Sequence, residues 1–239
     1  MEPTAPAGTV LGVCIGRVRP LEAGGRIHRT AFVKVPATEP VTLSVLGLEG
    51  DEHQYPAHGG PDQALLVYSA DHYPRWAEEF GLDLPEAGAF GENLTVVGLT
   101  EEEVCIGDTF ALGDEVVVQV TSPRSPCYKI GLRYDRRQLP LRMQETSRPG
   151  YLMRVLVEGE LRTGDRMRLI ERPSSALSVA EAARVVNRDR DDWPVVERLA
   201  AMPELAEAMR QTLTARLTSR DRDGDEHRLF GQGEGEPVA

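Results

Sequence analysis

A chain of 239 residues can bury one sizeable core, and 41% hydrophobic with 27% charged side chains is ordinary for a folded globular protein, which excludes disorder throughout. No run of about 18 apolar residues is present, so we expect no membrane-spanning helix. The formal net charge of −11 argues against broad, non-specific binding of nucleic acid by the whole chain.

Short strands dominate the predicted structure from residue 9 to about residue 171. Branched and alternating apolar residues predict strands over 10–18, 31–35, 41–46, 64–68, 94–97 and 109–121. We expect a helix after the fourth of these, because Asp71 is a good N-cap and Gly81 can end it. This pattern predicts a mainly β (α+β) domain with a few helices.

A repeated turn makes that prediction more specific. Gly107-Asp108 and Gly164-Asp165 each stand directly before an alternating strand, and repeated turn-and-strand units are typical of a small barrel. Between these two turns we expect a helix over 136–145, which Pro149-Gly150 would end. Gly24-Gly25 is one more turn signal.

The segment Glu-Arg-Pro-Ser-Ser at 171–175 breaks the pattern, and every element predicted after it is helical. Ser178 and Glu181 form a capping box, Asp192-Trp193-Pro194 begins a second helix, and Pro203 begins a third with an apolar stripe. We therefore predict a mobile tail at 1–8, a β-barrel domain at 9–173, a three-helix domain at 174–219 and a mobile, charged tail at 220–239.

Cys127 lies in the sequence Pro-Arg-Ser-Pro-Cys-Tyr-Lys, which makes it a candidate functional residue. The prolines restrict the loop, and the cations Arg124 and Lys129 favour a thiolate, the form that attacks electrophiles or binds a soft metal. Most cysteines are small buried apolar residues, and Cys14 and Cys105 fit that description because aliphatic residues flank them. Three scattered cysteines also suit a reducing compartment, so we expect a cytoplasmic protein.

The charge of the chain is uneven. Residues 124–154 hold eight cationic and two acidic side chains, a net charge of +6, which leaves −17 for the remainder. A cationic island of this kind suits an anionic ligand, since arginine matches the geometry of phosphate. For Arg136, Arg137 and Arg142 we favour the alternative of a solvated helix face.

Two loops rich in small residues are candidate parts of a site. Gly59 and Gly60 follow His58, and such glycines allow a ligand to approach main-chain amides. His58 could donate a proton, orient a water molecule or hold an anion, but on this segment alone a tight turn with an incidental histidine is the simpler explanation. In the second loop, Glu92 and Asn93 could orient a polar ligand or only cap a turn.

Other motifs carry little weight. A zinc site made of His53, His58, His72 and Cys127 has no compact spacing. The segment 221–226 resembles part of a calcium loop but lacks the closing glutamate. No glycine-rich phosphate loop or dinucleotide fingerprint is present, so we predict no nicotinamide site.

Four segments, taken in order, resemble those of a known family. They are His-Gly-Gly-Pro-Asp-Gln-Ala at 58–64, Gly-Ala-Phe-Gly-Glu-Asn-Leu at 88–94, Val-Cys-Ile-Gly-Asp at 104–108 and the seven residues around Cys127. Together they are similar to the MOSC domain (the C-terminal domain of molybdenum-cofactor sulfurases) of the bacterial YiiM-like type. The resemblance extends over about residues 9–219 and implies a β-barrel with flanking helices, followed by the three-helix domain of YiiM-like proteins at 178–219.

This resemblance implies that the ligand is the molybdenum cofactor, a pterin with a dithiolene and a phosphate tail. Cys127 falls where the family carries its molybdenum-ligating cysteine, and His58 would lie near the metal as a proton donor or orienting group. The implied cofactor-binding residues belong to the two loops and the cationic island: Gly59, Gly60, Asp62, Glu92, Asn93, Arg124, Lys129 and Arg154. An aspartate would be expected shortly before His58, where Tyr55-Pro56-Ala57 stand. Pyridoxal phosphate binding is attached to the family only as a general label.

YiiM-like proteins are implicated in reducing N-hydroxylated compounds, such as hydroxylaminopurines, to amines. The resemblance therefore implies a reductase that removes oxygen from an N-hydroxylated small molecule with two electrons and two protons. Electrons would arrive from another protein, since no flavin, haem or nicotinamide site is predicted. The three-helix domain could dock that donor; support of the barrel and formation of a homodimer are the alternatives.

Two other functions stay open from the sequence. The same pocket could hold or transfer sulfur or the cofactor without turning over a substrate. The three-helix domain could instead be a helix-turn-helix-like reader of DNA, but its acidic residues argue against that. These residues are Glu181, Asp189, Asp191, Asp192, Glu197, Glu204 and Glu207. We therefore predict neither nucleic acid nor a membrane as a partner.

Overall fold

The structure is a computed structural model that describes residues 5–54 and 59–219. The predicted tail at 220–239 lies outside these residues, and so does His58. The tail predicted at 1–8 is partly wrong, because the first strand already begins at Ala7 and pairs there with the last strand of the barrel.

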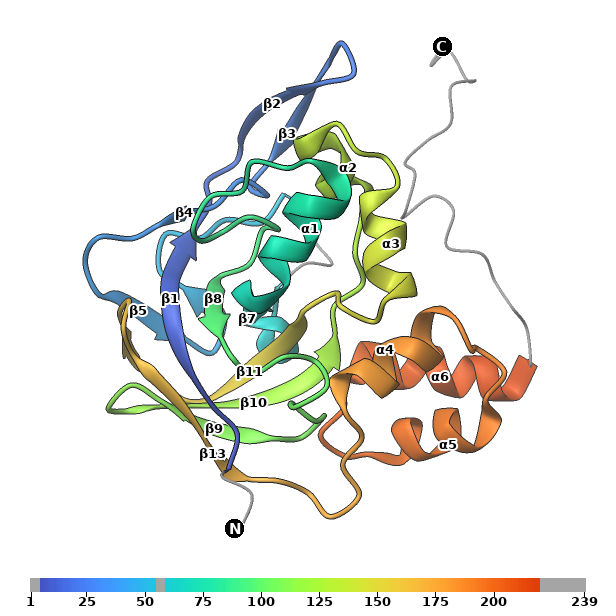
Figure 1. The fold of residues 1–239 in the computed structure, drawn as a ribbon. Coiled ribbons are helices and arrows are strands. Elements are labelled where there is room, and N and C mark those ends of the chain that lie inside the picture. The colour runs from blue at the N-terminus through green and yellow to red at the C-terminus, as the bar shows by residue number, and fades with distance from the viewer. Residues whose placement is uncertain (1–4, 55–58, 220–239) are drawn as a thin grey trace.

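Seven strands of the described chain close into a barrel (Figure 1). The ring closes where its first strand in the sequence pairs with its last, and neighbouring strands are antiparallel except for one parallel pair, β7 and β8. Around the barrel the order is β13 (Arg166–Glu171), β9 (Thr109–Leu112), β10 (Val116–Pro123), β11 (Tyr151–Val157), β7 (Leu65–Ser69), β8 (Leu94–Val97) and β1 (Ala7–Ile15).

Smaller elements surround the barrel. A short strand, β4 (Val35–Pro36), pairs with the far end of β1. A three-stranded sheet contains β12 (Gly159–Leu161), β5 (Val41–Ser44) and β6 (Gly47–Leu48). The hairpin of β2 (Arg19–Ala23) and β3 (Arg26–Thr30) projects from the body of the protein (Figure 1). Two turns of 3-10 helix are η1 (Pro61–Gln63) and η2 (Ala70–His72).

The α-helices form two groups (Figure 1). One group lies against the barrel: α1 (Tyr73–Phe80), α2 (Tyr128–Tyr134) and α3 (Leu139–Glu145). The other is the predicted helical part: α4 (Val179–Asn187), α5 (Trp193–Ala201) and α6 (Glu207–Ser219). The Ser178 side chain accepts the N–H of Glu181 at 3.1 Å, which confirms the predicted cap of α4. No helix in the described residues is long and apolar enough to cross a membrane.

Alternating side chains along the strands explain the barrel core. On β10, Val116, Val118 and Val120 are at most 1% exposed, while the residues between them face outward. Burial of one valine side chain contributes about 1.5–3 kcal/mol. The ladder of β10 and β11 is irregular between Val120 and Ser122, and such a bulge redirects the end of a strand. The loop that carries Cys127 begins directly after it.

A second core, rich in aromatic residues, lies under the first group of helices. Tyr68, Trp76 and Phe90 are fully buried in it. The indole N–H of Trp76 donates to the hydroxyl of Tyr68 at 2.6 Å, so these polar groups are satisfied inside the protein. Ile130 of α2 packs into the same cluster, which anchors the helix that follows Cys127.

The mainly β barrel with flanking helices is confirmed, but the strand predicted over 31–35 is wrong. β3 ends before Ala31, and β4 contains only Val35 and Pro36. Between them the side chain of Lys34 is buried and forms an ion pair with Asp51. A tertiary contact therefore determines this segment, rather than the extended ladder that its branched residues favour.

Two further elements differ from the prediction. The strand predicted over 109–121 is the hairpin of β9 and β10, which turns at Gly113 with φ of 63°. Helix α2 is absent from the predicted elements, because it is short and directly follows the proline-rich loop, where prolines usually indicate irregular structure. Helix α3 starts at Leu139 rather than at 136.

Candidate functional site

The loop at 123–127 is held at both ends. Pro123 pairs with Tyr151 in the β10–β11 ladder, and the N–H of Arg124 donates to the carbonyl of Gly150 at 2.9 Å. Cys127 is half-buried and directly precedes α2, where the N–H of Ile130 donates to its carbonyl at 3.1 Å. Cys127 is therefore partly exposed, and two packed elements, β11 and α2, fix the backbone on either side of it.

The other two cysteines are core residues, as predicted. Cys14 and Cys105 are buried. Burial, together with the negative charge of Glu92, raises the pKa of the Cys14 thiol to about 12. Burial also raises the pKa of Cys105. Both thiols therefore stay protonated near neutral pH, and neither is a good metal ligand or nucleophile.

Arg124 is the buried cation of this loop. It is 8% exposed, and its Nη1 has no hydrogen-bond partner among the described residues. Burial lowers the pKa of Arg124, while its electrostatic interactions with Cys127 and Glu92 act in the opposite direction. A buried donor without an acceptor costs about 1–3 kcal/mol. The Nη1 of Arg124 is thus a donor suited to an anionic group that the described part of the chain does not supply.

Lys129 lies in the first turn of α2, two residues after Cys127, and is half-buried. In the described part of the chain, its amine takes part in no hydrogen bond or ion pair. Cys127, Arg124 and Lys129 therefore come from one short segment, as the sequence predicts, and the two cations have no acidic partner there.

The Gly59-Gly60 turn needs both of its glycines. Their φ angles are 81° and 88°, a region that favours glycine. A Cβ on Gly59 would lie 2.9 Å from ring atoms of His53, whereas a Cβ on Gly60 would meet no atom of residues 5–54 and 59–219 within 4 Å. The described residues therefore leave space for a ligand beside Gly60. His53 enters the sequence analysis only within the zinc set, because its closeness to Gly59 depends on how the chain folds.

Glu92 belongs to the frame of the site rather than to a ligand-binding surface. It is fully buried, and its carboxylate accepts the hydroxyl of Tyr73, the N–H of Phe90 at 2.7 Å and the hydroxyl of Thr95 at 2.9 Å. These bonds hold the second small-residue loop against α1 and β8. The same network raises the pKa of Tyr73, mainly through burial and then through Glu92.

Asn93 has a similar internal role. Its side chain accepts the N–H of Leu66 at 3.1 Å and donates to Asp51 at 2.9 Å. Asp51 also accepts the N–H of Gly16 at 2.7 Å and pairs with Lys34, whose pKa burial lowers. The predicted loop residues Glu92 and Asn93 thus anchor the barrel, and we assign neither of them to cofactor binding.

Asp62 and Arg154 bind each other. Arg154 Nη2 lies 2.8 Å from Asp62 Oδ1, and its Nη1 donates to Gln119 at 3.2 Å. The second oxygen of Asp62 accepts the N–H of Glu207, the first residue of α6, at 2.9 Å. Both predicted cofactor-binding side chains are therefore engaged where the barrel meets the three-helix domain.

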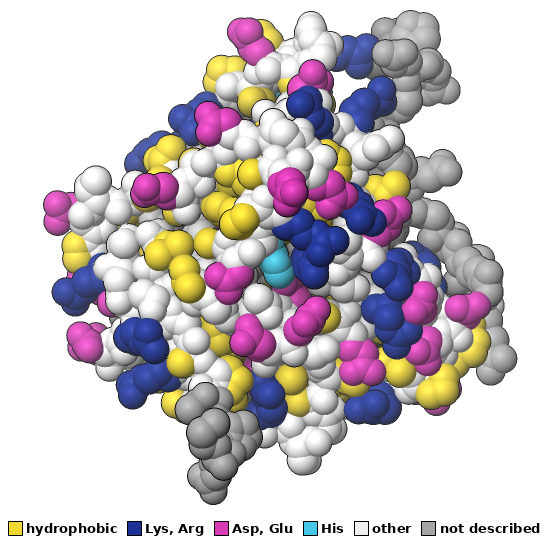
Figure 2. Space-filling view, in the orientation of Figure 1, with side chains coloured by type: hydrophobic (Ala, Val, Ile, Leu, Met, Phe, Trp, Pro, Cys, Tyr) yellow, Lys and Arg dark blue, Asp and Glu magenta, His cyan; other side chains and the backbone are white. Residues whose placement is uncertain are grey.

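The structure disperses the remaining cations of the 124–154 window. Arg133 donates to the carbonyl of Gly88 at 2.6 Å, and Arg142 pairs with Glu79 at 2.6 Å. Arg136 and Arg137 are exposed, but they lie in the turn between α2 and α3 and not on the predicted helix face. Figure 2 shows basic and acidic side chains interspersed on the visible face. Among the described residues, no group of three or more His, Cys, Asp or Glu side chains could hold a metal ion, so the zinc site gains no support.

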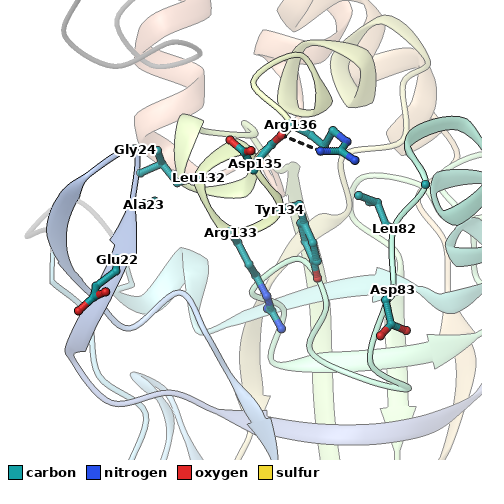
Figure 3. A pocket seen from close by; sticks show the side chains of 11 residues that line it. Glu22, Ala23, Gly24, Leu82, Asp83, Leu132, Arg133, Tyr134, Asp135 and Arg136 are labelled. Carbon is teal, nitrogen blue, oxygen red and sulfur yellow. Dashed lines mark hydrogen bonds between the residues drawn. The ribbon is translucent and has the colours of Figure 1, made fainter.

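A groove of about 620 Å3 opens at the far end of α2 (Figure 3). Figure 3 shows Arg133 and Tyr134 pointing into the space between Glu22 of the hairpin and Asp83. Cys127 is not part of its lining, and the seven residues of α2 place the two about 10 Å apart along the helix axis. We locate the candidate site at Cys127, because the buried donor of Arg124 lies there.

Comparison with known proteins identifies the family. The MOSC-domain family model matches residues 54–168. The chain is 41% identical to the uncharacterized protein YflK of Bacillus subtilis, over 84% of this chain and 91% of that one. It is 37% identical to protein YiiM of Escherichia coli, over 85% and 91% of the two chains. A protein of Gibberella moniliformis named reductase is 40% identical over 77% of this chain, which spans only 33% of that protein.

Solved structures agree with the sequence relatives. The crystal structure of YiiM from Geobacillus stearothermophilus matches with a TM-score of 0.74 and 32% identity, over 88% of this chain and 99% of that one. The crystal structure of YiiM from Escherichia coli matches with a TM-score of 0.73 and 31% identity, over 96% and 100%. The barrel, the loop around Cys127 and these likenesses lead to one conclusion: the chain belongs to the YiiM-like family of MOSC-domain proteins.

Proposed function

We propose that this protein binds the molybdenum cofactor at Cys127 and reduces N-hydroxylated compounds to amines, with electrons from a separate redox protein. MOSC domains are associated with this cofactor at the level of the family. The observation that carries the proposal is the half-buried Cys127 together with the buried Arg124, which interacts electrostatically with Cys127 and whose Nη1 has no partner among the described residues.

The residues present fit such a ligand. A thiolate is the side chain that binds a soft, redox-active metal. Within the described residues, Arg124 Nη1 and the amine of Lys129 have no partner and could donate to an anionic part of the ligand, and Gly60 has space beside its backbone. Two prolines and the ladder to Tyr151 keep these groups in a fixed arrangement, so little order has to be gained on binding.

The reaction breaks an N–O bond, consumes two electrons and two protons, and gives an amine and water. The bound cofactor would supply the two-electron chemistry. This chain's residues would hold the cofactor through Cys127, balance its charge with Arg124 and Lys129, and deliver protons to the departing oxygen. Histidine suits that last task near neutral pH. His53, exposed beside Gly59, is the described candidate, and His58 stays a prediction.

The relative named reductase supports a separate source of electrons. The segment similar to this chain makes up only 33% of that protein, so two thirds of it lie outside the likeness. A reductase built in this way has room for an electron-supplying part next to a YiiM-like part. None of the relatives cited above is named for pyridoxal phosphate, and we do not propose that ligand.

Metal analysis tests the cofactor part of the proposal. We expect molybdenum in the wild-type protein produced in a host that makes the cofactor, and its loss in Cys127→Ala. Cys105→Ala is the matched control, since it removes a buried thiol elsewhere and should keep the metal. Equal molybdenum content in the three proteins would contradict the role of Cys127.

Turnover tests the reductase part. Cofactor-loaded protein with an artificial reductant should convert a hydroxylaminopurine to the aminopurine, and the Cys127→Ala variant should not. A loaded wild-type protein that retains molybdenum but yields no amine would favour the alternative, a protein that carries or transfers the cofactor or its sulfur.

A further inference from the structure

Helix α6 takes its N-terminal cap from a distant part of the chain. The residue before the helix is Ala206, whose side chain has no acceptor, and the N–H of Arg210 donates to its carbonyl at 3.0 Å as the first helical bond. The N–H of Glu207, which has no acceptor within the helix, donates to Oδ2 of Asp62 at 2.9 Å, and the two residues are 145 positions apart in the sequence. Asp62 therefore provides the cap, which also suits the positive end of the helix.

The same place carries a second tie between the domains. The N–H of Ala206 donates to the carbonyl of Thr121 at 2.9 Å. The hydroxyl of Thr121 donates in turn to the carbonyl of Asp62 at 2.7 Å. Thr121 is buried and lies in the irregular part of β10, two residues before the loop that leads to Cys127.

Asp62 is also fixed to the barrel and to the glycine turn. Its Oδ1 pairs with Arg154 of β11 at 2.8 Å. Asp62 is the middle residue of η1, the turn that follows Gly60. The N–H of Gln63, at the end of η1, donates to the carbonyl of Gly60 at 2.9 Å. One carboxylate thus joins α6, a barrel strand and the turn that leaves space for a ligand.

We propose that the three-helix domain positions the Gly59-Gly60 turn and the Cys127 loop, with Asp62 as the positioning residue. If α6 moves relative to the barrel, it must either carry Asp62 and Thr121 with it or break the bonds to both. The conformations of the Gly59-Gly60 turn and of the Cys127 loop are therefore coupled to the position of α6 on the barrel. Because such coupling is reciprocal, a ligand bound at the candidate site would also stabilise the docked position of α6. This role concerns the domain itself and does not require the proposed reductase activity.

The N–H of Glu207 can be removed without changing Asp62. We compare Glu207→Pro with Glu207→Ala by hydrogen–deuterium exchange of the protein without cofactor. Both variants lose the same exposed carboxylate, but only proline removes the donor, and proline is well tolerated in the first position of a helix. We expect the N–H of Gln63 and the peptide over 59–63 to exchange several-fold faster in Glu207→Pro than in Glu207→Ala.

A second readout reports on the loop at the sulfur. Alkylation of Cys127 by iodoacetamide should be several-fold faster in Glu207→Pro than in Glu207→Ala, while the buried Cys14 and Cys105 stay unmodified in both. Equal exchange at 59–63 and equal alkylation in the two variants, even with a loosened first turn of α6, would overturn the proposal, because Asp62 would then only cap a helix.

If Glu207→Pro does not fold, Asp62→Ala and Asp62→Asn decide the question. Alanine removes the acceptor, and asparagine keeps one oxygen for the N–H of Glu207. We expect faster exchange in both α6 and 59–63 for alanine, and recovery of most of the protection for asparagine. Acceleration confined to α6 would reject the proposal. Neither readout uses cofactor or substrate, so failure of the reductase proposal is distinguishable from failure of this one.

Discussion

Arg124 is a buried cation whose Nη1 finds no acceptor in the described protein, so it destabilises the protein unless an anion binds there. Replacement by methionine should leave the cofactor-free protein as stable as the wild type or about 1 kcal/mol more stable. The same change should weaken retention of the cofactor about ten- to a hundredfold, the value of one charge-assisted hydrogen bond.

The matched control for this prediction is Arg142→Met. Arg142 pairs with Glu79 on the surface and lies outside the candidate site, so its loss should affect neither property by much. Thermal unfolding of the cofactor-free proteins and their molybdenum content after production in a competent host provide the two measurements. A marked loss of stability in Arg124→Met without loss of metal would assign Arg124 to the frame of the barrel.

Cys14 gives a prediction about pH. Its thiol has an ordinary pKa of 9.0 and a folded-state pKa of about 12. Between these values the unfolded chain has lost the proton and the folded chain still holds it, so the free energy of unfolding falls as the pH rises above 9. The protonated Cys14 thiol makes its full contribution to the free energy of unfolding below pH 9. Above pH 9 this contribution falls by up to about 1.4 kcal/mol per pH unit.

Urea unfolding at pH 8, 9, 10 and 11 checks this effect in wild type and Cys14→Ala. Alanine lowers stability at every pH because it leaves a small cavity, but it should flatten the decline above pH 9. The buried tyrosines, whose pKa values burial also raises, contribute equally to both proteins. Parallel curves for the two proteins would show that Cys14 is not the source of the slope.

At the scale of elements, the two Gly-Asp turns are built alike. Asp108 accepts the N–H of Cys105 at 2.8 Å, and Asp165 accepts the N–H of Arg162 at 2.9 Å, three residues back in each case. The environments differ, because Asp108 is fully buried and also binds Arg172 through two bonds at 2.6 and 2.7 Å.

Asparagine substitution should therefore have unequal effects at the two turns. Asp108→Asn leaves Arg172 without its charged partner, and we expect a loss of about 2 kcal/mol, less than for a fully buried pair because Arg172 is a third exposed. Asp165→Asn keeps an acceptor, and the ion pair of Asp165 with the exposed Arg162 is long at 3.9 Å, so this change should cost under about 1 kcal/mol. Urea denaturation of both variants measures the difference, and equal losses would contradict it.

Local pattern predicts most of the fold because strand alternation and turn residues act within a few positions of each other. The strands at 41–44, 65–69 and 94–97 and the cap at Ser178 follow in this way. The segment at 31–35 does not, since the contact of Lys34 with Asp51 determines its course. Helix α2 is missed because its short sequence lacks a full apolar period next to two prolines.

The residues of the candidate site also fall into those that local sequence predicts and those whose roles depend on distant contacts. Cys127, Arg124 and Lys129 are predictable together because their chemistry is concentrated in seven consecutive residues. The internal roles of Glu92 and Asp62 are not, since their partners include Tyr73 and Glu207, which only the fold brings near. The sequence does not distinguish a polar residue that binds a ligand in a glycine-rich loop from one that only holds the loop in place.

At the scale of the whole molecule, the barrel and the three-helix domain share a hydrophobic core. Leu177, Val179 and Leu213 belong to the same buried cluster as the strand residues Val118 and Leu112. We therefore expect one cooperative unfolding transition rather than two, because neither part can leave without exposing apolar surface of the other.

The two tryptophans of the chain allow a direct test, since Trp76 lies in α1 and Trp193 in α5. In Trp76→Phe the fluorescence reports on the helical domain, and in Trp193→Phe it reports on the barrel side. Within each variant the urea midpoint from fluorescence should equal that from far-ultraviolet circular dichroism, even if loss of the bond from Trp76 to Tyr68 lowers both. Separate midpoints in either variant would show independent domains.

The pairing of β1 with β13 has a consequence for synthesis on the ribosome. Thr9 and its partner Arg166 are 157 positions apart in the sequence, so the barrel cannot close until all the residues between them have been translated. Until then the nascent chain keeps the edge of β1 unpaired, a condition that promotes association with other strands. Folding dominated by such a remote contact is slow, and under the proposed function the cofactor would be inserted only after the ring is complete.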